Sequence, residues 1–421
     1  MIEAQVTKPR LLSRRHIAAI LAGNALEFYD FLIFSFFAIP IGRTFFPSQA
    51  PDTSLLSALA TFGVGYLTRP LGGIVIGLIA NRAGRKPAML LSFGLMGLSM
   101  LGLACTPGFA AIGVAAPVLA IVWRLLQGFA VGGDVGPTTA VLVEGAPLRR
   151  RGLFGSLQIA TQQVAITVVG LVGVGLSSHL DPAAMQGWGW RAALLAGLMV
   201  VPVGLIVRNS LPETLHAAKT EDEPFVRGIA RLIATIFLVM ASMTVGTYVL
   251  NTLTTYAIST LKMDPGIGFA ATLVRGACGA GSALLGGALS DRIGRRWPMI
   301  VAFAGAGLLA VPLLMWVAAT RSPPVLLVAS GVLGAFVAVA GTPILTVAVE
   351  GLPARWRAGA TGIIYAFAIS VFGGSTPFVV TWLTQVTHNP LTPGWYLLVA
   401  AAVGLVALWF LPETAPGRRK I

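Results

Sequence analysis

Long apolar runs separated by short polar segments dominate the chain, and they predict an all-α membrane protein. A bilayer core needs about 20 apolar residues per helix, and by this measure the sequence contains twelve candidate spans. The runs are continuously apolar rather than alternating, which favours helices over barrel strands. The expected spans cover approximately residues 17–41, 55–80, 88–106, 112–139, 154–177, 190–209, 228–258, 267–290, 298–318, 324–348, 358–385 and 394–411.

The composition excludes most soluble classes of protein. Of the 421 residues, 56% are hydrophobic and only 10% are charged, whereas soluble domains carry about 25% charged residues. This excludes a disordered chain, an ordinary soluble enzyme and a nucleic-acid-binding domain. The first apolar run contains Asn24, Glu27 and Asp30, so we expect a retained helix rather than a removable signal peptide. The two cysteines lie in separate apolar runs and indicate no disulfide framework.

The net charge of +14 is explained by membrane topology. If the N-terminus is cytoplasmic, 22 of the 29 basic residues fall in cytoplasmic segments, four in outer loops and three within spans. Basic residues concentrate on the cytoplasmic side of membrane proteins, where they face anionic lipid. We therefore expect a multi-pass protein of the cell membrane, the inner membrane of a bacterium, with both termini cytoplasmic and no nucleic-acid partner.

Three segments recur in the same order at a nearly constant offset, which predicts two halves of equal orientation. We expect halves at residues 1–214 and 228–421, joined by a cytoplasmic linker at residues 215–227. Parallel six-helix repeats place a substrate site at their interface near the bilayer midplane. The repeated pairs are Asn81–Lys86 with Asp291–Arg296, Val143–Pro147 with Val349–Pro353, and Leu211–Thr214 with Leu411–Thr414.

Several motifs carry a family resemblance. The segments Gly77–Lys86 and Gly287–Arg296 resemble the signature loop of the major facilitator superfamily, and Arg124–Gly128 resembles its fourth-helix motif. The resemblance implies that fold, a monomer and proton-coupled uptake of a small organic acid or zwitterion. Further segments resemble the metabolite–proton symporter family, and within it the citrate and tricarballylate carriers. These segments are Leu26–Phe31, Thr68–Gly72, Arg124–Gly136, Gln162–Ile166, Trp188–Arg191, Phe372–Pro377 and Thr392–Trp395.

The signature loops imply a set of gating and structural residues. In the family, the loop carboxylate joins a charge network with the loop arginines and a helix N-terminus. Asn81 stands at the acidic position of the first loop, whereas the second loop keeps Asp291. Asparagine can accept a hydrogen bond at a helix start but cannot pair charges, so we expect a weaker lock in the first half. The remaining members of the set are Arg82, Arg85, Glu144, Arg292, Arg295 and Glu350.

Three acidic residues within the spans are candidates for proton coupling. Glu27 and Asp30 are three residues apart and share one helix face. Two close carboxylates do not both ionise easily, so one of them should carry a proton. The alternative is a permanent ion pair with Arg124 or Arg69. Asp134, after two glycines on the fourth span, is either a proton-relay or gating group or the structural partner of an arginine.

Three arginines within the spans complement these acids. Arg124, with Gln127 one turn away, can bind a carboxylate through its planar fork, or it can serve the motif's role in helix packing. Arg275 has no acid near it in sequence, so it either binds an anionic substrate or extends toward the outer surface. Arg69, in the Arg69-Pro70 pair that interrupts the second span, is expected to pair with Glu27 or Asp30.

Polar stripes on two spans predict the lining of a cavity. Gln158 and Gln162, with Thr161, lie on one face of the fifth span, and Tyr248, Asn251 and Tyr256, with Thr255, lie on the seventh. Such groups would go unsatisfied in lipid, although bonding between helices is an alternative. No phosphate-binding loop signature and no metal-ligand cluster is evident, so we expect neither cofactor nor metal.

These features predict a secondary transporter rather than an enzyme. The expected activity is proton-coupled symport of a small organic di- or tricarboxylate, similar to citrate or tricarballylate, by alternating access. The alternatives are a proton-coupled carrier of a zwitterionic osmolyte or other metabolite, and a drug–proton antiporter. An enzyme is disfavoured because no nucleophile–histidine arrangement is present.

Overall fold

The computed structural model describes residues 14–83, 85–132, 135–199, 202, 228–353 and 357–416. Their regular structure is helical throughout. Helices before residue 200 are α1 (Arg14–Phe36), α2 (Ala38–Phe45), α3 (Pro51–Val64), α4 (Arg69–Ala83), α5 (Arg85–Cys105), α6 (Phe109–Ile112), α7 (Ala115–Val131), α8 (Val135–Glu144), α9 (Arg151–His179), α10 (Pro182–Ala184) and α11 (Trp190–Ala196). Helices after residue 228 are α13 (Ile229–Asn251), α14 (Leu253–Ser259), α15 (Pro265–Ile293), α16 (Arg296–Thr320), α17 (Pro323–Gly351), α18 (Arg357–Ala368), α19 (Gly374–Thr387) and α20 (Thr392–Phe410).

The predicted membrane helices are largely present. In the described part of the chain, nine helical segments are long and apolar enough to cross a bilayer. Two shorter apolar helices, Leu90–Cys105 and Ala115–Val131, match the third and fourth expected spans. The sixth expected span, 190–209, begins with α11, and most of its second half lies outside the described residues. The prediction of an all-helical, multi-pass membrane protein is confirmed.

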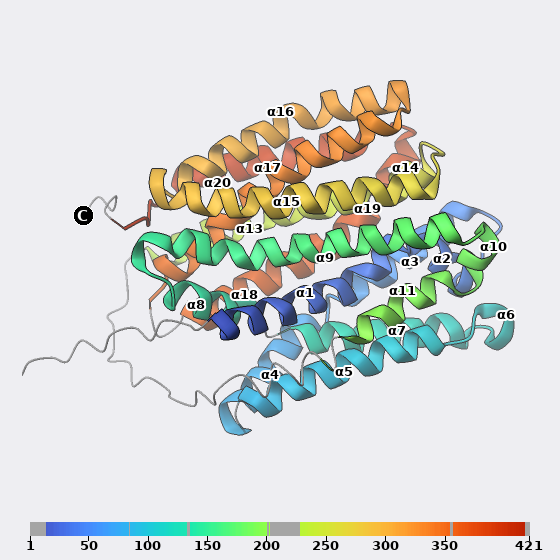
Figure 1. Cartoon of the computed structure of the whole chain (residues 1–421), viewed down its shortest axis with the longest axis horizontal. Coiled ribbons are helices and arrows are strands. Elements are labelled where there is room, and N and C mark those ends of the chain that lie inside the picture. The colour runs from blue at the N-terminus through green and yellow to red at the C-terminus, as the bar shows by residue number, and fades with distance from the viewer. Residues whose placement is uncertain are drawn as a thin grey trace, which may run out of the picture.

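Two long helices form the centre of the molecule. α9 and α15 run side by side along most of their length, with α4, α5 and α7 on one side and α16, α17 and α20 on the other (Figure 1). Glycines allow this approach. A Cβ atom on Gly170 would lie 2.4 Å from the backbone nitrogen of Leu273, and one on Gly276 would lie 2.5 Å from that of Thr167. Small residues at helix interfaces are characteristic of membrane bundles.

The outer faces are apolar and the interior contains charge, the reverse of a soluble protein. Large side chains such as Leu308 and Trp409 are mostly exposed, whereas Arg124 and Arg275 are among the largest fully buried side chains. α1 begins and α20 ends at the same end of the molecule (Figure 1). The division into residues 1–214, 215–227 and 228–421 stays a prediction, because residues 203–227 lie outside the described part.

Candidate functional site

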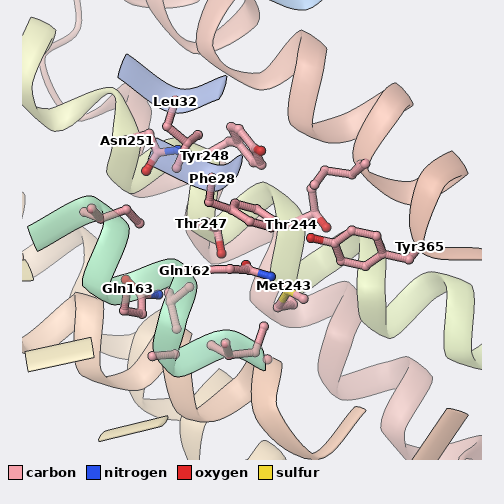
Figure 2. A pocket seen from close by; sticks show the side chains of 16 residues that line it. Phe28, Leu32, Gln162, Gln163, Met243, Thr244, Thr247, Tyr248, Asn251 and Tyr365 are labelled. Atoms are coloured by element: carbon pink, nitrogen blue, oxygen red, sulfur yellow. The ribbon is translucent and has the colours of Figure 1, made fainter. Parts of the chain in front are cut away.

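A central cavity lies where helices from before and after the expected linker meet. The non-atom space among its lining residues is about 480 Å³, and this volume includes the part that is open to solvent. α1 and α9 form one wall, and α13, α17 and α18 form the other (Figure 2). Its polar side chains are uncharged amides and hydroxyls, and apolar side chains complete the lining. The polar members are Gln162, Gln163, Thr244, Thr247, Tyr248, Asn251 and Tyr365.

Arg275 lies directly behind this cavity. Its Nη1 donates to Oδ1 of Asn251 and its Nη2 donates to the carbonyl of Thr247 at 3.3 Å. Asn251 and Thr247 line the cavity, but Arg275 itself does not. The side chain fits because α17 has Gly334 opposite it, where a Cβ atom would lie 2.7 Å from Cγ of Arg275. No carboxylate of the described residues forms an ion pair with this fully buried guanidinium.

Arg124 belongs to a second buried set, between α7 and α1. Its Nη1 donates to Oε1 of Gln127, and Nε2 of Gln127 donates to Oδ1 of Asp30 at 2.8 Å. The guanidinium also lies over the rings of Phe31 and Phe62, 4.3 and 5.0 Å from their centroids. Oδ2 of Asp30 is buried without a hydrogen-bond partner among the described residues. An arginine, an amide and a carboxylate thus form one chain inside the protein.

Tyrosines connect this set to the cavity. The hydroxyls of Tyr66, between α3 and α4, and Tyr248, on α13, are hydrogen-bonded at 2.5 Å. Arg69 is buried and lies over the rings of Phe31 and Tyr66. Tyr248 lines the cavity, so this pair of hydroxyls links the cavity wall to the ring of Tyr66, over which Arg69 lies.

The other predicted cavity residues occupy different positions. Glu27 is buried on α1 and interacts electrostatically with Tyr365. Gln158 is not part of the cavity lining and donates from Nε2 to Oδ1 of Asn24 at 2.8 Å. Tyr256 donates to the carbonyl of Pro390 at 2.8 Å. Of the predicted substrate residues, the cavity therefore collects Gln162, Tyr248 and Asn251, and leaves Arg124, Arg275, Gln158 and Tyr256 outside its lining.

The second signature loop forms a buried charge network. Asp291 accepts hydrogen bonds from the backbone nitrogens of Gly152 and Leu153, at 2.8 and 2.9 Å, at the start of α9. Arg295 forms ion pairs with Asp291 at 2.7 Å and Glu350 at 2.9 Å. Burial alone would lower the pKa of Arg295, but hydrogen bonds and charge from Glu350 and Asp291 outweigh it and raise that pKa above its ordinary value. Arg292 is exposed at the end of α15.

The first loop offers fewer described contacts. Asn81 and Arg82 lie on α4 and Arg85 begins α5, but their side chains, like Asp134 altogether, lie outside the described residues. Glu144, at the end of α8, forms an ion pair with Arg357 of α18 at 3.0 Å. This pair is partly exposed and joins the two halves of the sequence.

The sequence interpretation missed four polar cavity residues, namely Gln163, Thr244, Thr247 and Tyr365. On α13, an i, i+3, i+4, i+7 spacing connects Thr244, Thr247, Tyr248 and Asn251. The polar face of this helix therefore begins closer to its N-terminus than predicted, and helical spacing was the signal that could have identified the two threonines. Nothing in the sequence around Tyr365 distinguishes it from a packing residue. Within the described residues, no group of three histidine, cysteine or acidic side chains could hold a metal ion.

The fold and the buried, charge-flanked cavity define a multi-pass membrane transporter. The family model of the Major Facilitator Superfamily matches residues 20–377 and 236–421. The chain belongs to this superfamily. A crystal structure of a D-xylose-proton symporter has the same fold, with a TM-score of 0.77 at 18% identity over 96% of this chain and 98% of that one.

Relatives of known activity cover nearly the whole chain. It is 35% identical over 407 residues to the citrate-proton symporter of Salmonella typhi, covering 93% of this chain and 92% of the relative. It is 32% identical to the alpha-ketoglutarate permease of Escherichia coli K12, covering all of both chains. It is 31% identical to the proline/betaine transporter of the same strain, covering 96% and 84%. The predicted family and the assignment as a transporter rather than an enzyme are confirmed.

Proposed function

We propose that the protein is a proton-coupled symporter that takes up a small organic di- or tricarboxylate similar to citrate. The observation that carries this proposal is Arg275, a fully buried arginine joined to the cavity through Asn251. A buried charge without an opposite charge is costly. A carboxylate in the cavity would supply that opposite charge.

Asp30 is the proposed proton carrier. Its carboxylate is fully buried, accepts one hydrogen bond from Gln127 and lies near Arg124, with Tyr29 and Glu27 on its own helix. Taking up one proton at Oδ2 removes the negative charge and leaves the hydrogen bond from Gln127 intact. Releasing that proton on the other side of the membrane completes the cycle.

Alternating access would occur by rocking along the α9–α15 contact. The cavity lining comes from both sides of this contact, so relative movement of the two sides would open it toward one face or the other. The Asp291–Arg295–Glu350 network and the Glu144–Arg357 pair lie at one end, where we propose that they close the cytoplasmic side. Their separation would release the substrate.

Uptake into proteoliposomes tests this proposal. Labelled citrate, tricarballylate and alpha-ketoglutarate would be supplied outside vesicles that contain the purified protein, with and without an inward proton gradient. Accumulation of at least one of them should be stimulated by the gradient and abolished by a protonophore. Gradient-independent equilibration, or no uptake of any carboxylate, would contradict the proposal.

A zwitterionic osmolyte is the second candidate substrate. The cavity wall includes the aromatic rings of Phe28, Tyr248 and Tyr365, and aromatic faces attract quaternary ammonium groups. The 31% identity to a proline/betaine transporter adds support. Labelled glycine betaine in the same vesicles distinguishes the two candidates.

A further inference from the structure

Two of the buried arginines, Arg124 and Arg275, each contact a carboxamide, and the contact fixes how that carboxamide is oriented. A guanidinium only donates hydrogen bonds, so the atom facing it must be the amide oxygen. For Gln127 this leaves Nε2 to donate to Asp30. For Asn251 it leaves Nδ2 as the free end of the group. Both amides therefore present an N–H donor on the side away from the arginine.

The difference lies in what the second amide can donate to. Asn251 is 1% exposed, and its Nδ2 has no acceptor among the described residues. A buried donor without an acceptor costs about 1–3 kcal/mol. Figure 2 shows the Asn251 side chain reaching from α13 into the space beside Leu32 of α1. Asn251 lines the cavity, so this unpartnered donor belongs to the cavity wall.

We infer that a carboxylate of the substrate accepts a hydrogen bond from Nδ2 of Asn251. The substrate carboxylate takes the same place beside the Asn251 amide that the Asp30 carboxylate takes beside the Gln127 amide. Arg275 then acts as a positioning residue. It orients the amide and places a positive charge behind it, without touching the substrate. This inference rests on the proposed transport function and adds which atom receives the anion.

The arrangement makes a specific demand on the ligand. Charge-assisted hydrogen bonds are stronger than neutral ones, so the site favours an anionic oxygen over an alcohol or an ether. Every polar side chain that lines the cavity is uncharged, and Arg275 donates to the Asn251 amide, so the amide presents its N–H with a positive charge behind it. A carboxylate is therefore the recognised group, whatever the rest of the molecule is.

Variants of Asn251 test the inference in full-length protein. Asn251→Ala removes the donor, and Asn251→Asp places a fixed carboxylate beside Arg275. Both should raise KM for labelled citrate about 10- to 100-fold, the equivalent of one charged hydrogen bond, with a smaller change in kcat. Asn251→Gln keeps an amide and should recover part of the affinity. The matched control is Thr255→Val, because Thr255 is not part of the cavity lining and, among the described residues, its hydroxyl donates to the carbonyl of Thr252 in the adjoining turn.

A folding measurement separates loss of binding from loss of structure. Citrate should raise the Tm of the wild-type protein in detergent but not that of Asn251→Ala or Asn251→Asp, each compared with its own ligand-free Tm, because Asn251→Ala also removes the side-chain acceptor of Arg275. If Asn251→Ala and Asn251→Asp keep the wild-type KM and the citrate-induced rise in Tm, the inference is wrong.

A ligand panel distinguishes failure of this inference from failure of the proposed function. Glycine betaine carries a carboxylate and choline does not. Uptake of glycine betaine instead of citrate would overturn the di- or tricarboxylate assignment. The inference would then require the Asn251 variants to raise KM for glycine betaine. Equal uptake of choline and glycine betaine would overturn the inference, and uptake of no compound in either panel would overturn both.

Discussion

Arg124 and Arg275 are both fully buried on membrane helices, yet their surroundings differ. Arg124 lies over aromatic rings and reaches a carboxylate, Asp30, through Gln127. Arg275 contacts an amide and a backbone carbonyl, and no carboxylate of the described residues forms an ion pair with it. One arginine has its anion within the protein, and the other lies one amide away from a cavity.

This difference suggests separate roles for the two arginines. Arg124 lies near Asp30, a side chain that can be protonated, and this arrangement suits proton binding. Uptake and release of the proton change the charge of Asp30 and leave the charge of Arg124 unchanged. A charge with no acidic partner in the described residues suits an external anion, because the arriving ligand supplies the missing charge. The same fold would thus handle the proton mainly in its first half and the substrate mainly in its second.

The largest expected effect comes from removing the acid of the first set. Asp30→Asn keeps an acceptor for Gln127 but cannot release a proton, so accumulation driven by a pH gradient should fall to the equilibrium level. Exchange of labelled for unlabelled citrate should continue. Both are measured in the same vesicles, and gradient-driven accumulation by the variant would show that Asp30 is not the proton carrier.

The second largest effect is expected from breaking the Asp291–Arg295–Glu350 network, which should lower the free energy of unfolding. Arg295→Gln removes the ion pairs with Asp291 and Glu350, and removing one member of a buried pair costs about 3 kcal/mol or more. Because the pKa of Arg295 is raised above its ordinary value, its stabilising charge is fully present below the ordinary arginine pKa and is lost only as the pH rises through the raised value. The loss should therefore have the same size at neutral and mildly alkaline pH. Thermal unfolding in detergent checks this, and an unchanged Tm would contradict it.

A smaller effect is expected at the hydroxyl pair that links the two sets. Tyr66→Phe removes the hydrogen bond to Tyr248 but leaves the cavity lining intact, so a loss of about 1 kcal/mol should change the exchange rate by up to about fivefold. KM should stay the same. A double-mutant cycle with Tyr248→Phe should give a coupling energy of similar size, whereas additive effects would show that the bond is not coupled to transport.

The smallest effect is expected at the exposed pair between the halves. Glu144→Gln removes the ion pair with Arg357, and surface pairs contribute about 0–1 kcal/mol. The exchange rate should change only at low ionic strength, because salt screens exposed charges. A change that persists in high salt would mean that the pair has another role.

The fold was largely predictable because the bilayer imposes it. Backbone groups in lipid must be satisfied within helices, so hydropathy alone locates the spans. Local interruptions were harder to place. The Arg69-Pro70 pair marked a break in the second span, and the structure has turns at residues 65–68 before α4 begins at Arg69. The separation of α13 from α14 at Thr252 has no comparable signal.

The site was predictable only as far as helical periodicity reaches. Gln162, Tyr248 and Asn251 lie on polar helix faces, and Gln127 lies one turn from Arg124, so local spacing identified them. The contact of Gln127 with Asp30, and the position of Arg275 behind Asn251, depend on how separate helices pack. Tyr365 enters the cavity from a helix with no polar stripe, so its role requires the tertiary structure.

The most direct test of the account compares the two arginines in one assay. Counterflow of labelled citrate at equal pH would be measured for Arg275→Gln and Arg124→Gln, followed by accumulation in a pH gradient. Arg275→Gln should raise KM at least about tenfold, as expected for loss of a charged interaction. Arg124→Gln should keep KM within about twofold, because Arg124 contributes little to the free energy of substrate binding. The same variant should no longer accumulate citrate in a pH gradient. A wild-type KM for Arg275→Gln, or a raised KM for Arg124→Gln with accumulation intact, would contradict the account.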